Sequence, residues 1–205
     1  MILQSLAGLP AFLVYFCEAT VAVIAYLFVY TRITPYAEFD QVRAVNPYGA
    51  SKLAGEWFVQ HLSNRFYIIR TAWVTAPGGR NFVHRIQQLA DERGSLQVVN
   101  DEVANPTFVG DLADGIVRLI ATGCYGIYHL TNAGPVSRYD YAKRILELTG
   151  RAHVPITPIT LAEFKRASTP PRYAPLANYM AAGLGITLRP WEEALAEFVA
   201  VSQTP

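Results

Sequence analysis

Two side chains that could do chemistry together, Tyr48 and Lys52, lie four positions apart in the sequence. Positions i and i+4 share one face of an α-helix, so the phenol and the ammonium group can point into one cleft. A free tyrosine has a pKa of about 10, and a nearby lysine cation lowers that pKa because it favours the phenolate. Such a tyrosine can pass a proton to a carbonyl oxygen while a cofactor delivers hydride to the carbon, and the lysine can hold ribose hydroxyls. The spacing predicts a proton-donor site on a helix.

The spacing alone does not select this pair, because Tyr139 and Lys143 repeat it. A bare Tyr-x-x-x-Lys pattern on a helix is most often a solvated face. The choice between the two pairs therefore depends on the surrounding sequence.

Composition excludes several other classes of site. The chain has 205 residues, of which 52% are hydrophobic and 16% charged, as expected of a folded protein. Its net charge is +1 and the basic residues are scattered, so we expect no binding to nucleic acid. The two cysteines, Cys17 and Cys124, form no CxxC pair, and the four histidines show no metal spacing. We expect no disulfide framework and no metal, and a cytoplasmic location.

The elements that must position the tyrosine pair alternate between strands and helices. Helices are expected at residues 48–62, 81–93, 109–121, 139–148 and 190–201, and strands at 66–73, 96–99, 127–130 and 154–160. Such alternation predicts βαβ units and an α/β fold with a largely parallel sheet. Ligands of these sheets bind beyond the carboxyl ends of the strands, which indicates the loops at residues 74–81 and 132–138.

The first thirty residues allow two interpretations. From Leu6 to Tyr30 the only charged residue is Glu18, and the stretch is long enough for a membrane helix. Pro10, Glu18 and the β-branched run at residues 20–24 instead favour a strand buried on both faces of a parallel sheet, with its connections. We expect the strand and no membrane association, although periodicity does not separate the two interpretations.

Eight short segments match, in order, the motifs of one enzyme family. They lie at residues 35–40, 46–56, 69–74, 79–83, 105–107, 111–113, 126–132 and 189–195. Together they resemble the dTDP-4-dehydrorhamnose reductases, which are extended short-chain dehydrogenases, over about residues 35 to 201. The resemblance selects Tyr48 and Lys52, because Asn46-Pro47-Tyr48-Gly49-Ala50-Ser51-Lys52 looks like the family's active-site helix. Tyr139 falls in a helix that carries no catalytic group in the family.

The resemblance implies a fold, an activity and a division of the chain. The fold would be a partial Rossmann-like parallel sheet with a smaller C-terminal substrate-binding part. Residues 1–75 would be a remnant of the dinucleotide-binding domain, in which 1–34 form an atypical apolar segment. Residues 76–205 would mainly bind substrate, with 126–132 returning to the sheet. The activity would be reduction of a nucleotide-linked 4-keto sugar by NADPH or NADH.

The resemblance also assigns roles to individual residues. Tyr48 would be the proton donor and Lys52 the anchor for the cofactor ribose. Trp73 would lie in the substrate cleft, although a tryptophan is equally often part of a core.

Three further residues would contact the nucleotide-sugar. Asn81 and Phe82 would lie near it, and Arg172 would pair with its diphosphate, since a guanidinium fork suits phosphate oxygens. For Asn81 a helix cap is the plainer explanation, and for Arg172 a solvated loop charge.

The sequence departs from the family before residue 35. The family opens with a glycine-rich turn that binds the cofactor pyrophosphate, whereas Gly8 is the only glycine before Gly49. The family also places a hydroxyl on the preceding strand, and residues 24–30 offer no clear match. We expect a gene truncated or frame-shifted upstream of about Thr31. We also expect weak cofactor binding and a reductase activity far below that of a full-length relative.

Other functions stay open on the sequence alone. They are a sugar-nucleotide epimerase or dehydratase, a non-catalytic nucleotide-sugar-binding or regulatory fragment, and a fragment without function. Half of a Rossmann sheet would expose a strand edge and apolar helix faces, which a partner chain or a homodimer could cover.

Overall fold

The main sheet brings together strands from distant parts of the chain. The computed structural model describes residues 13–16, 19–25, 34–78, 81–166 and 170–202. Four strands form the sheet in the order β1-β2-β3-β8: β1 (Leu13–Phe16), β2 (Ala19–Ala25), β3 (Phe66–Thr71) and β8 (Gly126–His129). β2, β3 and β8 run parallel, with Ala22 opposite Ile68 and Ile68 opposite Ile127, and β1 is antiparallel to β2. The parallel core of an α/β sheet is therefore present, as the alternation of elements predicts.

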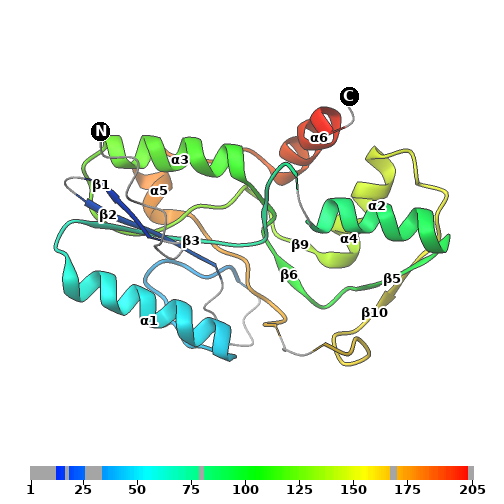
Figure 1. Ribbon diagram of the computed structural model, residues 1–205, viewed down its shortest axis with the longest axis horizontal. Helices are drawn as coiled ribbons and strands as arrows, with labels where there is room; N and C mark the ends of the chain where they lie inside the picture. Colours follow the sequence, from blue (N-terminus) through cyan, green and yellow to red (C-terminus); the bar gives the residue numbers. More distant parts are fainter. Residues whose placement is uncertain (1–12, 17–18, 26–33, 79–80, 167–169, 203–205) are drawn as a thin grey trace.

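Helices cover both faces of this sheet (Figure 1). They are α1 (Pro47–Leu62) on one face, and α3 (Val109–Ala121) and α5 (Tyr179–Gly183) on the other. Successive residues of a strand point to opposite faces, so Ile68 packs against Val59 of α1 while Ile69 packs in a cluster with Leu119 of α3. Every residue of β3 after Phe66 is buried, as is usual for a central parallel strand.

Local sequence explains where α1 begins. The Asn46 side chain caps the helix by accepting a hydrogen bond of 2.8 Å from the Gly49 main-chain N–H. Pro47 occupies the first turn, where its missing N–H costs nothing. Because α1 connects two parallel strands, β2 and β3, it must run antiparallel to them. The first turn of α1 therefore lies at the carboxyl edge of the sheet.

A buried ion pair between Glu56 of α1 and Arg70 of β3 connects the helix to the sheet. Arg70 of β3 donates two hydrogen bonds to the Glu56 carboxylate, from Nε at 2.8 Å and from a terminal nitrogen at 2.7 Å. Its other terminal nitrogen donates to the Glu38 carbonyl oxygen at 3.2 Å. The Glu38 carboxylate in turn accepts hydrogen bonds from the main-chain N–H groups of His129 and Met180. Charges this deeply buried are tolerated because they are paired and hydrogen-bonded.

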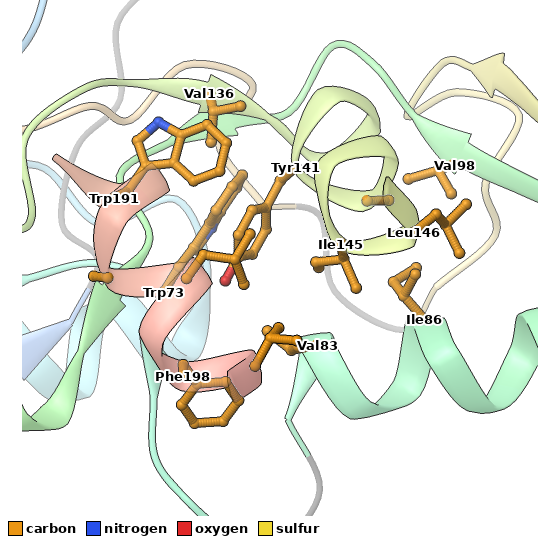
Figure 2. Packing of buried hydrophobic residues seen from close by; sticks show 14 of the residues in the cluster. Trp73, Val83, Ile86, Val98, Val136, Tyr141, Ile145, Leu146, Trp191 and Phe198 are labelled. Atoms are coloured by element: carbon orange, nitrogen blue, oxygen red, sulfur yellow. The ribbon is translucent and has the colours of Figure 1, made fainter. Parts of the chain in front are cut away.

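The second part of the molecule lies beside the sheet and has its own core (Figure 1). It contains α2 (Phe82–Arg93), α4 (Arg138–Leu148), α6 (Trp191–Ser202) and the parallel pair β5 (Leu96–Val99) and β10 (Ile156–Ile159). Two short pairs complete it: β4 (Val74–Thr75) with β7 (Thr107–Phe108), and β6 (Val103–Ala104) with β9 (Val136–Ser137). Figure 2 shows Val83 of α2, Ile145 of α4 and Phe198 of α6 converging in this core.

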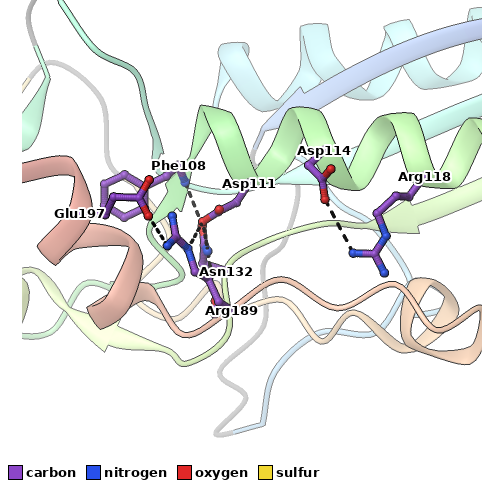
Figure 3. Close-up of polar contacts among 7 residues, drawn as sticks. All are labelled: Phe108, Asp111, Asp114, Arg118, Asn132, Arg189 and Glu197. Atoms are coloured by element: carbon purple, nitrogen blue, oxygen red, sulfur yellow. Dashed lines mark hydrogen bonds and ion pairs between the residues drawn. The ribbon is translucent and has the colours of Figure 1, made fainter. Parts of the chain in front are cut away.

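A polar network joins the two parts near the start of α3 (Figure 3). The Asn132 side-chain oxygen accepts a hydrogen bond of 2.9 Å from the Phe108 main-chain N–H. Its amide nitrogen donates to the Asp111 carboxylate at 2.7 Å and to the Arg189 carbonyl oxygen at 3.0 Å. Arg189 pairs with both Asp111 and Glu197. One side chain thus ties the loop after β8 to the entries of α3 and α6.

Most predicted elements are present, with shifted ends. The strand expected at 66–73 ends at Thr71, because Trp73 adopts a left-handed φ of +40° and turns the chain. The run at residues 20–24 forms the strand β2, as expected, whereas 6–12, 17–18 and 26–30 lie outside the described residues. The two-residue strands β4, β6, β7 and β9, the helix α5 and the antiparallel β1 were not predicted. No helix in the described part of the chain is long and apolar enough to cross a membrane.

Candidate functional site

The predicted tyrosine–lysine pair lies at the carboxyl edge of the sheet. Tyr48 is in the first turn of α1 with 51% of its surface exposed, and Lys52 follows one turn later. The Lys52 ammonium nitrogen lies 5.2 Å from the centre of the Tyr48 ring. The two side chains therefore share one helix face and are in contact, as their spacing predicts.

The protonation of Tyr48 differs from the sequence-based expectation. Partial burial raises the pKa of the Tyr48 phenol above its ordinary value of 10.0. The expected lowering of the Tyr48 pKa by Lys52 does not dominate, because desolvation disfavours the charged phenolate. Tyr48 is consequently a neutral phenol at neutral pH, which is the form that can give up a proton.

The second pair has a different environment. Tyr139 lies in the first turn of α4 and packs, partly buried, against the core of the second part. This packing against the core accounts for a tyrosine at position 139 without any catalytic role.

Trp73 occupies a strained position between the two parts. It is buried within the core of the second part, and its φ of +40° costs about 1–3 kcal/mol in a residue other than glycine. The Arg138 guanidinium lies 3.5 Å from the centre of the Trp73 ring and 4.7 Å from that of Phe82. The Trp73 indole nitrogen has no hydrogen-bond partner among the described residues. Trp73 is thus a core residue whose ring contacts the Arg138 guanidinium.

Asn81 caps α2. Its side-chain oxygen accepts a hydrogen bond of 2.9 Å from the His84 main-chain N–H, and its amide nitrogen donates to the Ala76 carbonyl oxygen at 3.1 Å. The helix-cap interpretation is confirmed, and a contact between Asn81 and a nucleotide-sugar stays a prediction.

A cavity of about 850 Å³ opens next to Phe82, between α2, β5 and β10. Its lining includes Phe82 and Phe164 and four arginines: Arg85, Arg93, Arg138 and Arg166. No Asp or Glu belongs to the lining formed by the described residues. The cavity therefore favours an anionic ligand that also carries a flat or apolar group.

Glu102 is not part of the cavity lining, but it pairs with two of the lining arginines. Its carboxylate contacts Arg138 Nε at 3.3 Å through one oxygen and an Arg166 terminal nitrogen at 2.9 Å through the other. Only 5% of the Glu102 side chain is exposed. A single buried carboxylate thus fixes two of the four cationic groups.

Arg172 lies outside the lining of this cavity. Its side chain is 71% exposed and its Nε is 3.7 Å from an Asp101 carboxylate oxygen. Its predicted pairing with a diphosphate stays a prediction.

Sequence reasoning did not identify the four arginines of the cavity. Two signals pointed toward them. Arg138 ends one of the loops expected to bind ligands, and Arg85 and Arg93 are eight positions apart, so they share a face of α2.

The described residues contain no group of three or more His, Cys, Asp or Glu side chains that could hold a metal ion.

Known proteins resemble this chain in both sequence and structure. The dTDP-4-dehydrorhamnose reductase of Mycolicibacterium smegmatis is 38% identical over 172 residues, which are 82% of this chain and 53% of that protein. The solved dTDP-4-dehydrorhamnose reductase of Clostridium acetobutylicum is 39% identical with a TM-score of 0.86, over 90% of this chain and 66% of that one. The dTDP-4-dehydrorhamnose reductase of Bacillus anthracis, solved in complex with NADP, is 37% identical with a TM-score of 0.83. The match covers 88% of this chain and 65% of that one.

These relatives are longer than this chain, which spans 53% of the Mycolicibacterium smegmatis protein and 58% of the spore coat polysaccharide biosynthesis protein SpsK of Bacillus subtilis. The family model of the RmlD substrate binding domain matches residues 16–204, which is most of the sequence. The chain belongs to the RmlD substrate binding domain family.

Proposed function

We propose that this chain serves the reduction of a nucleotide-linked 4-keto sugar by NADPH or NADH, with Tyr48 as the proton donor. The arginine-lined cavity beside Trp73 carries the proposal, because it suits the diphosphate of such a substrate. The relatives named dTDP-4-dehydrorhamnose reductase, one of them solved with NADP, support the reaction and the cofactor.

Tyr48 and Lys52 suit the nicotinamide–ribose end of the cofactor. The Lys52 ammonium group has three donors for ribose hydroxyls and lies beside the Tyr48 ring at the sheet edge where ligands of α/β proteins bind. A buried hydroxyl at the end of β3, Thr71 Oγ1, has no hydrogen-bond partner in the described part of the chain and adds a polar group at this edge. When bound, a reduced nicotinamide supplies the hydride.

The Tyr48 phenol completes the reduction. As hydride adds to the keto carbon, the carbonyl oxygen gains negative charge and takes the proton from the phenol O–H, which gives the alcohol. The phenolate left on Tyr48 is stabilised by the adjacent Lys52 cation. Because half of Tyr48 is exposed, the phenolate can regain a proton from solvent.

The substrate would extend from Trp73 into the cavity. Arg85, Arg93, Arg138 and Arg166 would face the diphosphate, and the Phe82 ring would contact the base. A volume of about 850 Å³ lies within the usual range for small-molecule sites. Asn81 at the start of α2 and Arg172 on its exposed loop would be additional contacts.

We also propose that the chain divides in function near residue 75. Residues 1–75, with 126–132, would form the dinucleotide-binding part, because β3 and β8 share one sheet, and α3 and α5 pack on that same sheet. Residues 76–205 would mainly bind substrate, since most of the separate core and the arginine-lined cavity come from this part of the chain.

A second copy of the chain is the partner that we propose for α1. The exposed face of α1 carries Trp57 (53% exposed), Phe58 (55%) and Leu62 (79%). The charged residues of the helix, Lys52 and Glu56, are both at least partly buried, so this face is uncharged and can pair with itself. These three side chains leave roughly 300–400 Å² exposed, about half of what each partner contributes to a stable dimer. Sedimentation of the chain and of Trp57→Ser tests this: a monomer in both would exclude the interface.

A cytoplasmic location is proposed on chemical grounds. Cys124 is an exposed free thiol, which persists most readily in a reducing compartment.

The experiment combines binding and turnover. Calorimetric titration with dTDP would measure occupancy of the cavity, and loss of NADPH absorbance with a dTDP-4-keto sugar would measure turnover. Tyr48→Phe should bind dTDP like the parent chain and lose turnover, whereas Tyr139→Phe, from the second pair, should keep both. Turnover that survives Tyr48→Phe would overturn the assigned donor. dTDP binding without any turnover would favour the non-catalytic binding function instead.

A further inference from the structure

We propose that Glu102 and Arg138 form a positioning unit that transmits occupancy of the cavity to the Trp73 indole. The inference rests on the proposed function, since it takes the occupant to be a nucleotide diphosphate. It assigns to Arg138 a role beyond that of a positive charge.

Arg138 is held on several sides. Its guanidinium lies 3.5 Å from the centre of the Trp73 ring and 4.7 Å from that of Phe82, and its Nε contacts Glu102 at 3.3 Å. The Arg138 main-chain N–H also donates to the Glu102 carbonyl oxygen at 3.0 Å. Main chain and side chain are therefore tied to the same residue, and the guanidinium cannot move without changing its stacking on Trp73.

Arg138 also lines the cavity. Arg166 lines it as well, and Glu102 pairs with both arginines. The Glu102 carboxylate contacts Arg138 through Nε, so the terminal amino groups keep donors for an anion in the cavity. An entering diphosphate would compete with Glu102 for the two guanidinium groups and draw Arg138 toward the cavity.

Trp73 is the residue that would respond. Its left-handed backbone is strained, and its indole nitrogen is buried with no hydrogen-bond partner among the described residues. One face of the ring rests on the Arg138 plane. Because Trp73 lies two residues after the carboxyl end of β3, a shift of its ring would align the sugar with Tyr48 at the same edge of the sheet.

A lysine would not replace Arg138 in this role. An ammonium group supplies a point charge, whereas the planar guanidinium stacks on an aromatic ring and donates in two directions at once. Arg138→Lys therefore keeps the positive charge but removes the planar group that stacks on Trp73.

The test follows dTDP binding by calorimetry and by tryptophan fluorescence in the 205-residue chain. The contribution of Trp73 is isolated by comparison with Trp73→Phe. We expect Arg138→Lys to weaken dTDP binding roughly ten- to hundredfold, the worth of one charge-assisted hydrogen bond, and to abolish the Trp73 fluorescence change. Glu102→Gln removes the charge that competes with the diphosphate, so dTDP binding should not weaken, whereas the Trp73 fluorescence change should become smaller because Arg138 is held less firmly. Arg144→Lys, on the same helix but outside the cavity and paired with Glu147, should change neither.

The outcomes separate the two proposals. If the parent chain does not bind dTDP, the proposed ligand of the cavity is wrong and this inference falls with it. If the parent binds and Arg138→Lys keeps both affinity and fluorescence change, only the positioning role is overturned. Thermal unfolding of each variant without ligand accompanies the titrations. If Arg138→Lys fails to fold, the Trp73 fluorescence change of Glu102→Gln tests the positioning role, and an undiminished change would overturn it.

Discussion

The buried histidine at the end of β8 should make this protein sensitive to mild acid. His129 is fully buried, and its ring Nδ1 lies 3.1 Å from the Ala177 carbonyl oxygen. Burial, with a smaller contribution from the Arg70 cation, lowers the pKa of His129 from 6.5 to about 3. The folded protein therefore keeps this imidazole neutral at pH values where the unfolded chain protonates it.

The sign and size of the effect follow from linkage. Because the pKa is lower in the folded state, stability is complete above pH 6.5 and is lost as the pH falls from 6.5 toward 3. Each pH unit in that window costs about 1.36 kcal/mol. At pH 5, which is 1.5 units below 6.5, His129 should reduce the free energy of unfolding by about 2 kcal/mol.

Urea unfolding at pH 7 and pH 5 would measure this loss. His129→Gln removes the titrating group, so its stability should fall by about 2 kcal/mol less than that of the parent over the same interval. The exposed His153 provides the control, and His153→Gln should retain the parental loss. The comparison uses the change with pH within each variant, so a lower starting stability of His129→Gln does not affect it. An equal loss in His129→Gln and the parent would refute the reasoning.

Two further predictions concern stability. Glu56→Gln breaks the buried pair with Arg70 and should cost about 3–5 kcal/mol in urea unfolding, whereas Glu147→Gln, in an exposed pair, should cost no more than about 1 kcal/mol. A small effect at Glu56 would mean that water reaches the pair. Asn81→Ala removes the cap of α2 and should cost about 0.5–2 kcal/mol, most of which Asn81→Ser should restore; equal losses in the two variants would argue against the cap.

The elements that the sequence predicted are those with strong local signals. The helix at 47–62 follows an Asn-Pro start, and the strand at 66–71 is a run of apolar and β-branched residues. Asn81 predicts the start of α2, because a capping side chain bonds a main-chain N–H only three residues away. In each case the information lies close to the residue that it concerns.

The site was predicted only in part, because its remaining members are joined by distant contacts. Tyr48 and Lys52 are local, whereas Arg138 meets Trp73 65 positions earlier in the chain. Tryptophan has no preference for a left-handed backbone, so the turn at Trp73 is imposed by tertiary packing and not by its residue type. A single sequence does not record such pairings, and for this reason the arginines of the cavity were missed.

The core of the second part has a consequence for the synthesis of the chain on the ribosome. Trp73 and Val83 share that core with Trp191 and Phe198 of α6, and Trp191 follows Trp73 by 118 positions. At about 5–20 residues per second, translation needs roughly 6–24 s to pass from one tryptophan to the other. Within this interval α2, and later α4, emerge before the helix that covers their apolar faces. The core of the second part can therefore be completed only after α6 has been synthesised.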